Sequence, residues 1–267
     1  MPIEAASEIS VLDQREFHAL DERFMGIVFS VHNEFGRLLD ESLHANAIAG
    51  RCVVAGLEPA EREVRLRVSH GTFRKDYVMD LLIAHGLMVE TKTVETLTSA
   101  HRAQALHYLL LAGLKHGRLL NLRTDRVQHE YVSTTLDPQE RRQFVIDDAD
   151  WREANPASRL LKQKFTELLK DWGAFLEVGL YRQGVMHFLG GASAAPQEVE
   201  VFDGTRVLGR QQVWMLNQDT AFACTALTHG IPEMRQHQRR FLDHTRLRFM
   251  QWINLNHHQI EFRTLAK

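Results

Sequence analysis

Residues 77–92 read Tyr-Val-Met-Asp-Leu-Leu-Ile-Ala-His-Gly-Leu-Met-Val-Glu-Thr-Lys, and the predicted structure of the first half of the chain is organised around them. Its period-two alternation predicts a β-hairpin with a turn at residues 84–86. Alternation places Glu90 and Lys92 on one face of the second strand. In this register Asp80 lies close to Glu90, so two carboxylates and an ammonium converge beside an apolar sheet.

Paired acidic oxygens of this kind suit a hard cation such as Mg²⁺ or Mn²⁺, and a neighbouring lysine can hold or polarise a water molecule. The alternative is structural: Glu90 and Lys92 form a solvated strand face, and Asp80 ends a strand. The pattern Asp-x9-Glu-x-Lys is short and degenerate, so the rest of the chain has to decide between them.

Composition indicates a soluble globular protein of 267 residues, with 44% hydrophobic and 25% charged residues. No apolar run approaches the ~20 residues of a membrane span, and the acidic start lacks a signal core. The two cysteines, Cys52 and Cys224, make neither a disulfide framework nor a zinc site, which predicts a reducing, cytoplasmic location. A net charge of −2 does not by itself indicate a nucleic-acid binder.

The first half shows an α-α-β-β-β-α-β-β pattern, which predicts a mixed α/β sandwich with helices against one sheet. The expected helices cover residues 11–35, 38–49 and 100–116. The expected strands cover residues 64–68, 77–83, 87–94, 118–122 and 128–134. Residues 1–137 are therefore expected to form one domain.

Residues 138–157 are charged and bounded by prolines, so we expect a linker or a lid there, with room for one short helix, and a second domain over 158–267. The second half repeats the element order of the first. Its helices are expected at 158–171, around 177–190 and at 232–249. Its strands are expected at 199–202, 207–216, 221–227, 251–255 and 259–264.

An offset of 133 residues places Leu119-Leu120-Asn121-Leu122 on Trp252-Ile253-Asn254-Leu255. Residues 130–133 then meet 261–264 if the preceding turn is shortened by two residues. Identity is low and coincidence is the alternative, but the matching element order favours a degenerate internal duplication.

The same offset has a chemical consequence. It puts Ala223 in place of Glu90, Thr225 in place of Lys92, and a histidine in place of Gln104. We therefore expect any active centre to belong to the first half alone.

An ordered set of short motifs runs through residues 20–135: Val31-His-Asn-Glu-Phe-Gly36, Glu41-Ser42, Asp80-Leu-Leu82, Glu90-Thr-Lys92, Ala103-Gln104 and Tyr108. This set resembles the GxxExxY family, which belongs to the PD-(D/E)xK nuclease superfamily. The sequence departs from the signature at two positions. Leu38 stands where the family has a glycine, and His44 stands where it has a tyrosine, so the role of that tyrosine does not carry over.

The resemblance implies a metal-dependent phosphodiesterase core in which Asp80 and Glu90 bind the metal. The Thr91 carbonyl is a candidate third oxygen. Glu41, from the second helix, would complete the shell directly or through water; otherwise it is an ordinary carboxylate on a helix surface.

Lys92 would orient or deprotonate the attacking water and offset charge on the scissile phosphate. Gln104 would hold the phosphate or the Lys92 ammonium; its alternative is a plain polar position on a half-exposed helix. His44 and His101 are expected to be surface or packing residues, because the chain has 15 histidines.

A basic helix is expected near the C-terminus and could contact phosphates along a duplex without reading its sequence. A solvated helix face is the commoner explanation of such a charge run. The candidate nucleic-acid-binding residues are Arg235, Arg239, Arg240, Arg246 and Arg248.

Taken together, the sequence predicts two nuclease-like domains in one chain, the first a Mg²⁺- or Mn²⁺-dependent nuclease and the second a degenerate partner. A single centre should nick one strand or cut single strands, with DNA favoured over RNA as the substrate. The alternatives are a non-catalytic nucleic-acid-binding or scaffolding protein, and a subunit of a larger assembly. The chain could also form a homodimer, and the sequence does not decide this.

Overall fold

The computed structural model describes residues 2–190 and 195–267, and the chain divides between Pro138 and Gln139 into two compact units. Each unit carries its own mixed sheet flanked by helices. Each also buries a hydrophobic core of its own.

The first unit is a six-stranded sheet with strand order β1-β2-β3-β4-β5-β6. All neighbours are antiparallel except β4 and β5, which are parallel and joined by the crossover helix α3. Its elements are β1 (Ile3–Ala5), α1 (Gln14–Phe35), α2 (Glu41–Val54), β2 (Ala60–His70), β3 (Phe73–Ile83), β4 (Leu87–Lys92), α3 (Ser99–Ala112), β5 (His116–Asn121) and β6 (Gln128–Ser133).

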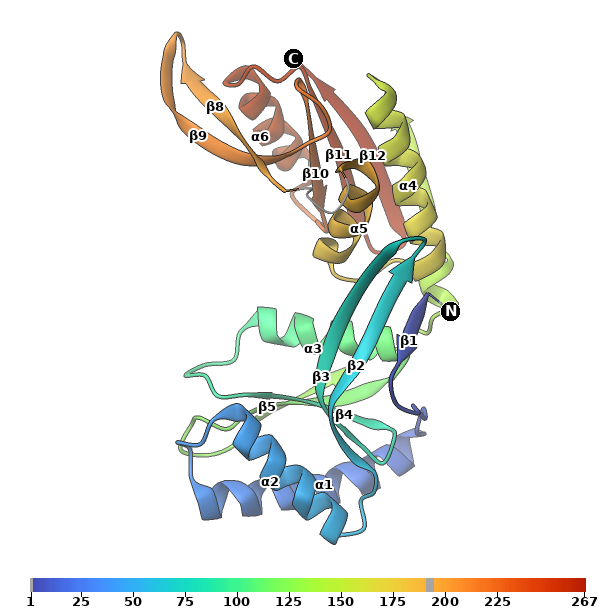
Figure 1. Cartoon of the computed structure of the whole chain (residues 1–267), viewed down its shortest axis with the longest axis vertical. Helices are drawn as coiled ribbons and strands as arrows, with labels where there is room; N and C mark the ends of the chain where they lie inside the picture. Colours follow the sequence, from blue (N-terminus) through green and yellow to red (C-terminus); the bar gives the residue numbers. More distant parts are fainter. Residues whose placement is uncertain (1, 191–194) are drawn as a thin grey trace. The chain divides into compact units, whose positions relative to one another are not determined.

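Helices α1 and α2 cover one face of this sheet and α3 covers the other (Figure 1). The α1–α2 face is a continuous apolar core to which the helices contribute at helical spacing and the strands at every second residue. Core side chains of α1 and the central hairpin include Phe17, Phe24, Val28, Val31, Leu81, Ile83, Leu87 and Val89.

Helix α1 is attached to the sheet by a charged contact. The guanidinium of Arg118 on β5 donates to both carboxylate oxygens of Asp21, at 2.7 and 2.5 Å. Asp21 is 5% exposed, so its charge is largely out of water and depends on this partner.

The second unit is also a six-stranded sheet, with order β7-β12-β11-β10-β9-β8. Strands β10 and β11 are parallel, as are β7 and β12. Its elements are a 3-10 turn (Glu140–Arg142), β7 (Val145–Asp150), α4 (Pro156–Trp172), α5 (Val178–Gly190), β8 (Gln197–Asp203), β9 (Arg206–Met215), β10 (Thr220–Thr225), α6 (Ile231–Asp243), β11 (Phe249–Asn256) and β12 (Gln259–Ala266).

Residues 138–157, expected as a linker, instead belong largely to the second unit. Their middle forms β7, which pairs with β12, and Asn155 caps α4 by accepting from the backbone N–H of Ser158. The charge of this segment is explained by pairing: Arg263 on β12 bonds Asp147 of β7. The expected linker is therefore a charged edge strand.

The basic helix is shorter than expected. Helix α6 ends at Asp243 rather than near residue 249, and the hydroxyl of Thr245 donates to the carbonyl of Leu242 just beyond it. Leu247 is buried and β11 starts at Phe249, so Arg246 and Arg248 lie outside the helix.

Several strand pairs of the two sheets share one register, although β8 and β9 shift by one residue between Val201 and Phe202. The parallel pair Lys92 and Asn121 in the first unit corresponds to Thr225 and Asn254 in the second, at an offset of 133. The same offset relates the antiparallel pairs Leu81–Val89 and Trp214–Phe222, and the hairpin pairs His70–Phe73 and Asp203–Arg206.

The offset also holds through the last hairpin, where Asn121 pairs with Gln128 and Asn254 with Glu261. Gln128 is therefore the counterpart of Glu261, and the two-residue shortening of this turn expected from the sequence is wrong. The two asparagines also make matching hydrogen bonds, because each accepts from the backbone N–H that follows its neighbouring strand, Val94 or Leu227.

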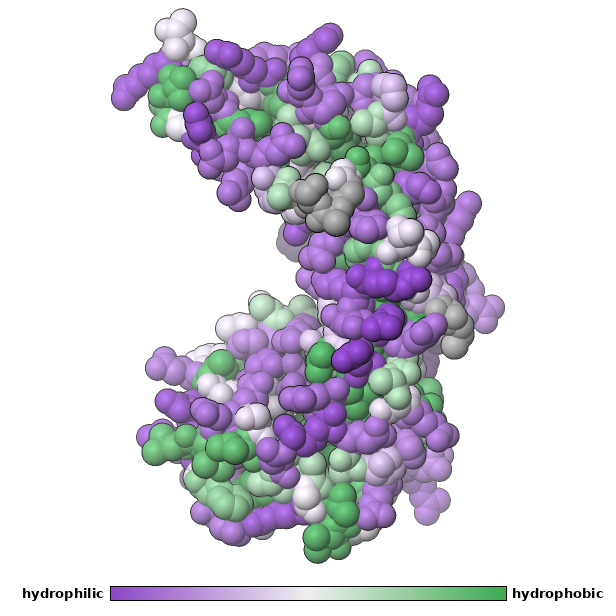
Figure 2. All heavy atoms as spheres, in the orientation of Figure 1, coloured by the Kyte–Doolittle hydropathy of each residue, from purple (hydrophilic) through white to green (hydrophobic). Residues whose placement is uncertain are grey.

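The face drawn in Figure 2 is mostly hydrophilic, and apolar side chains appear on it in small separate groups. Several exposed apolar residues belong to α1, α2 and the loop between them: Phe29, Phe35, Leu38, Leu43, Val53 and Val54. No helix in the described ranges is both long enough and apolar enough to cross a bilayer.

Candidate active site

The candidate site lies where β3 and β4 separate. Backbone pairing between the two strands ends at Leu81 and Val89, so the next pair in register is Asp80 and Glu90. The carboxylate of Asp80 replaces the missing backbone partner: its Oδ2 accepts from the backbone N–H of Thr91 (2.7 Å) and from the Thr91 hydroxyl (2.9 Å). The splayed hairpin therefore holds Asp80 against β4.

Glu90 and Lys92 lie on the same face of β4, as strand alternation requires. Lys92 Nζ donates to Glu90 Oε1 at 2.6 Å and to the carbonyl of Thr91 at 2.9 Å. The Glu90 side chain is 1% exposed and that of Lys92 is 13% exposed. The second oxygen, Glu90 Oε2, is buried and has no hydrogen-bond partner among the described residues.

Burial raises the pKa of Glu90 to about 7, with Asp80 adding to the rise, even though the Lys92 ammonium opposes it. For Lys92, burial lowers the pKa, but Glu90, Asp80 and Glu41 outweigh burial and the net pKa is raised. The ammonium is therefore a permanent cation near neutral pH, whereas Glu90 sits near its own midpoint.

Glu41, the first residue of α2, belongs to the same electrostatic group. Its pKa is raised by burial and by Asp80, while Lys92 and a hydrogen bond with the backbone of Thr93 lower it. Three acidic side chains from α2, β3 and β4 thus interact with one lysine.

Helix α3 supplies the polar groups across from β4. Gln104 Nε2 donates to the hydroxyl of Tyr108 at 3.0 Å. Burial raises the pKa of Tyr108, the hydrogen bond with Gln104 opposes this rise, and the charges of Glu90 and Asp80 add to it. Lys92 bonds Glu90 and Thr91 rather than Gln104.

The donor set fits a hard divalent cation in its chemistry, since it offers carboxylate oxygens and one of them, Glu90 Oε2, is buried and unsatisfied. The side chains do not stand as a finished ligand shell. Within residues 2–190 and 195–267 no group of three or more His, Cys, Asp or Glu side chains is arranged to hold a metal. The hydrogen bonds explain this, because Thr91 occupies one Asp80 oxygen and Lys92 occupies both Glu90 Oε1 and the Thr91 carbonyl.

His44 packs. It is fully buried on α2, its ring lies 6.4 Å from that of His32 at an interplanar angle of 18°, and burial followed by His32 lowers its pKa. His32 Nε2 lies 3.1 Å from the carbonyl of Thr124. The pair therefore joins α1, α2 and the β5–β6 turn, and His101 is a capping residue that accepts from the N–H of Thr98.

The corresponding position in the second unit is filled by Thr225, Trp252 and Asn254, and the Asn254 amide also donates to Glu261 on β12 at 3.1 Å. Thr225, the counterpart of Lys92, donates to Asn254 Oδ1 (2.8 Å) and accepts from the indole N–H of Trp252 (2.9 Å). Trp252 is paired with Ala223, the counterpart of Glu90, and is 1% exposed. This position therefore has no carboxylate or amine of its own.

The five candidate nucleic-acid-binding arginines do not lie together on one face of a helix, because Arg246 and Arg248 follow the end of α6. Arg235 bonds Asp150 (3.1 Å) and Arg248 lies 3.6 Å from Asp219. The guanidinium of Arg246 lies 5.0 Å from the centre of the Phe202 ring. Two of the five, Arg239 and Arg240, are exposed on α6 itself.

Two features of the first unit, the Tyr108 hydroxyl and the Asp21–Arg118 ion pair, had no role predicted from the sequence. The Tyr108 hydroxyl was signalled by its i, i+4 spacing to Gln104, which puts both on one helix face. The Asp21–Arg118 pair had no local signal, because 97 residues separate the partners.

Residues 18–133 match the family model of the PD-(D/E)XK nuclease superfamily. The matched segment lies within the first unit and contains Glu41, Asp80, Glu90, Lys92 and Gln104. Members of this superfamily are mostly nucleases that generally use divalent metal ions such as Mg²⁺ or Mn²⁺, although many are non-catalytic. The first unit is therefore similar to domains of this superfamily. No curated protein and no solved structure matches the chain.

Proposed function

We propose that the first unit is a metal-dependent nuclease that hydrolyses phosphodiester bonds. The observation that carries the proposal is the meeting of Asp80, Glu90 and Lys92 where the β3–β4 hairpin opens, with Glu90 Oε2 buried and unsatisfied. A buried acidic oxygen with no partner is costly unless it serves a ligand.

Asp80, Glu90 and Glu41 are the residues that would hold Mg²⁺ or Mn²⁺. When bound, such an ion supplies charge stabilisation at a phosphoryl oxygen. The Thr91 carbonyl becomes a further oxygen ligand only if the Lys92 ammonium turns away from it, since the two are 2.9 Å apart.

Lys92 acts as a donor rather than as a base, because its neighbours raise its pKa. Its ammonium can orient the attacking water and offset negative charge on the phosphate as the P–O bond breaks. Gln104 and Tyr108 provide an amide and a hydroxyl on the α3 side, where the amide positions a phosphate oxygen.

An open groove of about 390 Å³ is the proposed path of a nucleic-acid strand past this group, and it is lined by Arg37, Leu38, Glu95, Arg123, Thr124 and Asp125. Three of its lining residues are linked to the site along the chain or by one hydrogen bond. Leu38 lies three residues before Glu41 and Glu95 lies three residues after Lys92. Arg123 follows Leu122, whose N–H bonds the Lys92 carbonyl. The groove lies at the carboxyl ends of the parallel strands β4 and β5, where ligands of mixed sheets commonly bind.

The second unit is proposed to be a degenerate copy of the first. The shared offset of 133 across the paired strands, together with the matching hydrogen bonds of Asn121 and Asn254, supports descent by duplication. Since Thr225, Trp252 and Asn254 fill the corresponding position, a single chain has one centre and cuts one strand per encounter.

Arg239 and Arg240 on α6 are proposed to hold nucleic acid through its phosphates. Both are exposed, and neither makes an ion pair within the described residues. Arg235, Arg246 and Arg248 would contribute less, because each already contacts an acidic or aromatic side chain.

The test is cleavage of supercoiled plasmid and of labelled single- and double-stranded DNA and RNA, with Mg²⁺, Mn²⁺ or EDTA. Wild type should turn plasmid into open circles without linear product, and EDTA should stop the reaction. Lys92→Ala should reduce the rate by about 10² to 10⁴ while circular dichroism shows an unchanged fold. Equal activity of Lys92→Ala would contradict the proposal, and nucleic-acid binding without cleavage by wild type would identify a non-catalytic binding protein.

A further inference from the structure

The outer edge of the second sheet differs from that of the first. In the first unit, β2 is covered by β1, with Glu4 opposite Arg67 at the centre of the pairing. The second sheet ends at β8, and within the described residues no strand pairs with its outer side. Counted along the strand at the offset of 133, Val199, Glu200 and Val201 are the counterparts of the β2 residues that β1 covers, although a register shift between Val201 and Phe202 moves their partners on β9 by one residue.

The loop after α6 closes one end of this edge. Phe202 donates its backbone N–H to the carbonyl of His244, and His244 Nδ1 lies 2.9 Å from the Phe202 carbonyl. Residues 197–201 remain as an edge whose backbone groups can pair with an added strand.

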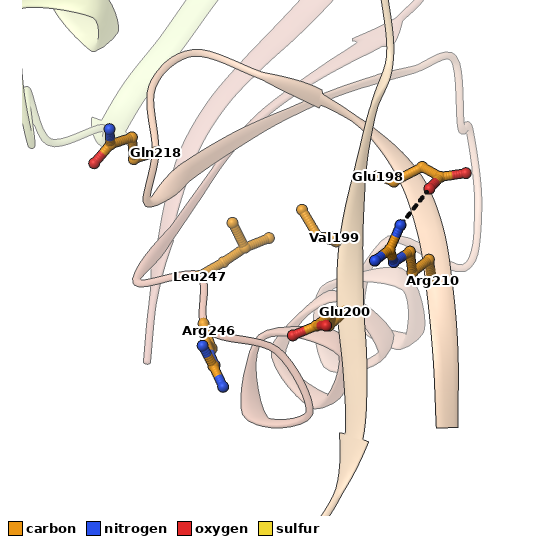
Figure 3. Close-up of a pocket in the computed structure, with 7 residues that line it drawn as sticks. All are labelled: Glu198, Val199, Glu200, Arg210, Gln218, Arg246 and Leu247. Atoms are coloured by element: carbon orange, nitrogen blue, oxygen red, sulfur yellow. Dashed lines mark hydrogen bonds and ion pairs between the residues drawn. The ribbon is translucent and has the colours of Figure 1, made fainter. Parts of the chain in front are cut away.

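A pocket of about 440 Å³ adjoins this edge. Figure 3 shows Val199 of β8 directed toward Leu247, with Glu200 and Arg246 at one end of the pocket. Val199 and Leu247 provide an apolar floor for one side chain. An open strand edge beside a side-chain pocket is the arrangement by which sheets capture extended peptides.

Charge selects the occupant. Glu198 is paired with Arg210 at 3.4 Å, and Glu200, which lies opposite Arg210 in the strand register and lines the pocket with Arg246, makes no ion pair of its own within the described residues. Two β8 strands of different copies would bring glutamates together, and β1 of a second copy would bring Glu4 toward Glu200, so both of these occupants are disfavoured.

We propose that β8 binds an extended segment of a partner protein that alternates aliphatic and basic residues, adding it as a further strand. The aliphatic side chain next to Val199 fills the pocket, and a lysine or arginine lies opposite Glu200. This reproduces the β1–β2 pairing with the charges exchanged.

The test uses the full chain and three fluorescein-labelled peptides, followed by fluorescence anisotropy. The first is Thr-Val-Lys-Val-Lys-Val-Thr, the second has glutamate for lysine, and the third is the first with alternate backbone nitrogens methylated. The basic peptide should bind, and both the acidic and the methylated peptides should bind at least about tenfold more weakly.

Glu200→Lys should weaken the basic peptide about tenfold and strengthen the acidic one, whereas Glu22→Lys, an exposed acid on α1, should change neither. Absence of binding, equal binding of the methylated peptide, or no effect of Glu200→Lys would overturn the proposal. So would a concentration-dependent dimer in sedimentation that Glu200→Lys alters, because the occupant would then be a second copy.

Discussion

At the scale of single residues, the candidate site buries acidic oxygens whose hydrogen bonding the protein alone satisfies incompletely. Glu90 shares one oxygen with Lys92 and leaves the other buried without a partner, while Asp80 is held by Thr91. The pKa of Glu90 is consequently raised to about 7, mainly by burial. Residues that are costly to bury in this way are typical of functional sites.

This raised pKa predicts a pH-dependent stability in EDTA. Between the ordinary value of 4.5 and about 7, the folded state binds the Glu90 proton more tightly than the unfolded state does. The contribution of Glu90 to stability is therefore greatest below 4.5 and is lost as pH rises toward 7. Glu90→Gln has no proton to lose, so its free energy of unfolding relative to wild type should rise by roughly 3 kcal/mol from about pH 4.5 to about pH 7.5.

Chemical unfolding at both pH values, followed by far-ultraviolet circular dichroism, checks this expectation. Glu130→Gln is the matched control, because the Glu130 side chain is 37% exposed and pairs with Arg102 at the surface. A Glu90→Gln difference that does not change with pH would show that Glu90 is ionised at its ordinary pKa.

At the scale of elements, helix α1 depends on the sheet for one of its charges. Arg118 on β5 makes a bidentate ion pair with Asp21, and the two side chains are mostly buried, at 15% and 8% exposure respectively. Removing one partner of a buried ion pair leaves the other charge without compensation.

Asp21→Asn should therefore destabilise the first unit by about 3 kcal/mol. All four tryptophans lie in the second unit, so circular dichroism follows both units and tryptophan fluorescence follows only the second. We expect the dichroism transition in urea to move and the fluorescence transition to stay. Glu34→Gln, which breaks the more exposed pair with Arg51, should cost no more than about 0.5 kcal/mol. A dichroism shift no larger than this control would contradict the assignment.

Local patterns predicted most elements correctly, because helices and strands here follow clear periodicity. The misplaced ones were decided by contacts that local patterns do not carry. The segment around β7 looked like a linker because its acids are paired by Arg263 of a strand more than a hundred residues away. The predicted range of helix α6 was too long, because the burial of Leu247 and the start of β11 at Phe249 end the helix even though the arginines continue at helical spacing.

The candidate site was predictable in part for the same reason. Asp80, Glu90 and Lys92 lie on one hairpin, whose alternation fixes their faces. That Lys92 bonds the Thr91 carbonyl rather than Gln104 depends on the side-chain positions at the open end of the hairpin, which no spacing encodes.

At the scale of the whole molecule, two sheets that share the register of several strand pairs carry different side chains at the same position. The first unit has Glu90 and Lys92 there, and the second has Ala223 and Thr225, with Trp252 bonded to the threonine. The exposed arginines of α6 belong to the second unit. We therefore propose that the first unit cleaves nucleic acid and that α6 of the second unit binds it.

This separation predicts the salt dependence of binding. Removing one cation that neutralises a phosphate lowers the slope of log K against log salt by about 0.9 on duplex DNA. The double variant Arg239→Ala and Arg240→Ala should reduce the slope by about 2 and weaken binding similarly for all sequences. Arg159→Ala, which removes an exposed arginine paired with Glu153, should not change the slope. An unchanged slope in the α6 double variant would remove this helix from the interface.

The central claim is that the first unit has one metal site built from acidic oxygens and that the second unit has none. Calorimetric titration of the full chain with Mn²⁺ tests it directly. One Mn²⁺ should bind per wild-type chain, and Asp80→Asn should weaken that binding by about tenfold or more while Asp219→Asn leaves it unchanged. Two ions per chain, or one ion that binds Asp80→Asn as tightly as wild type, would contradict the account.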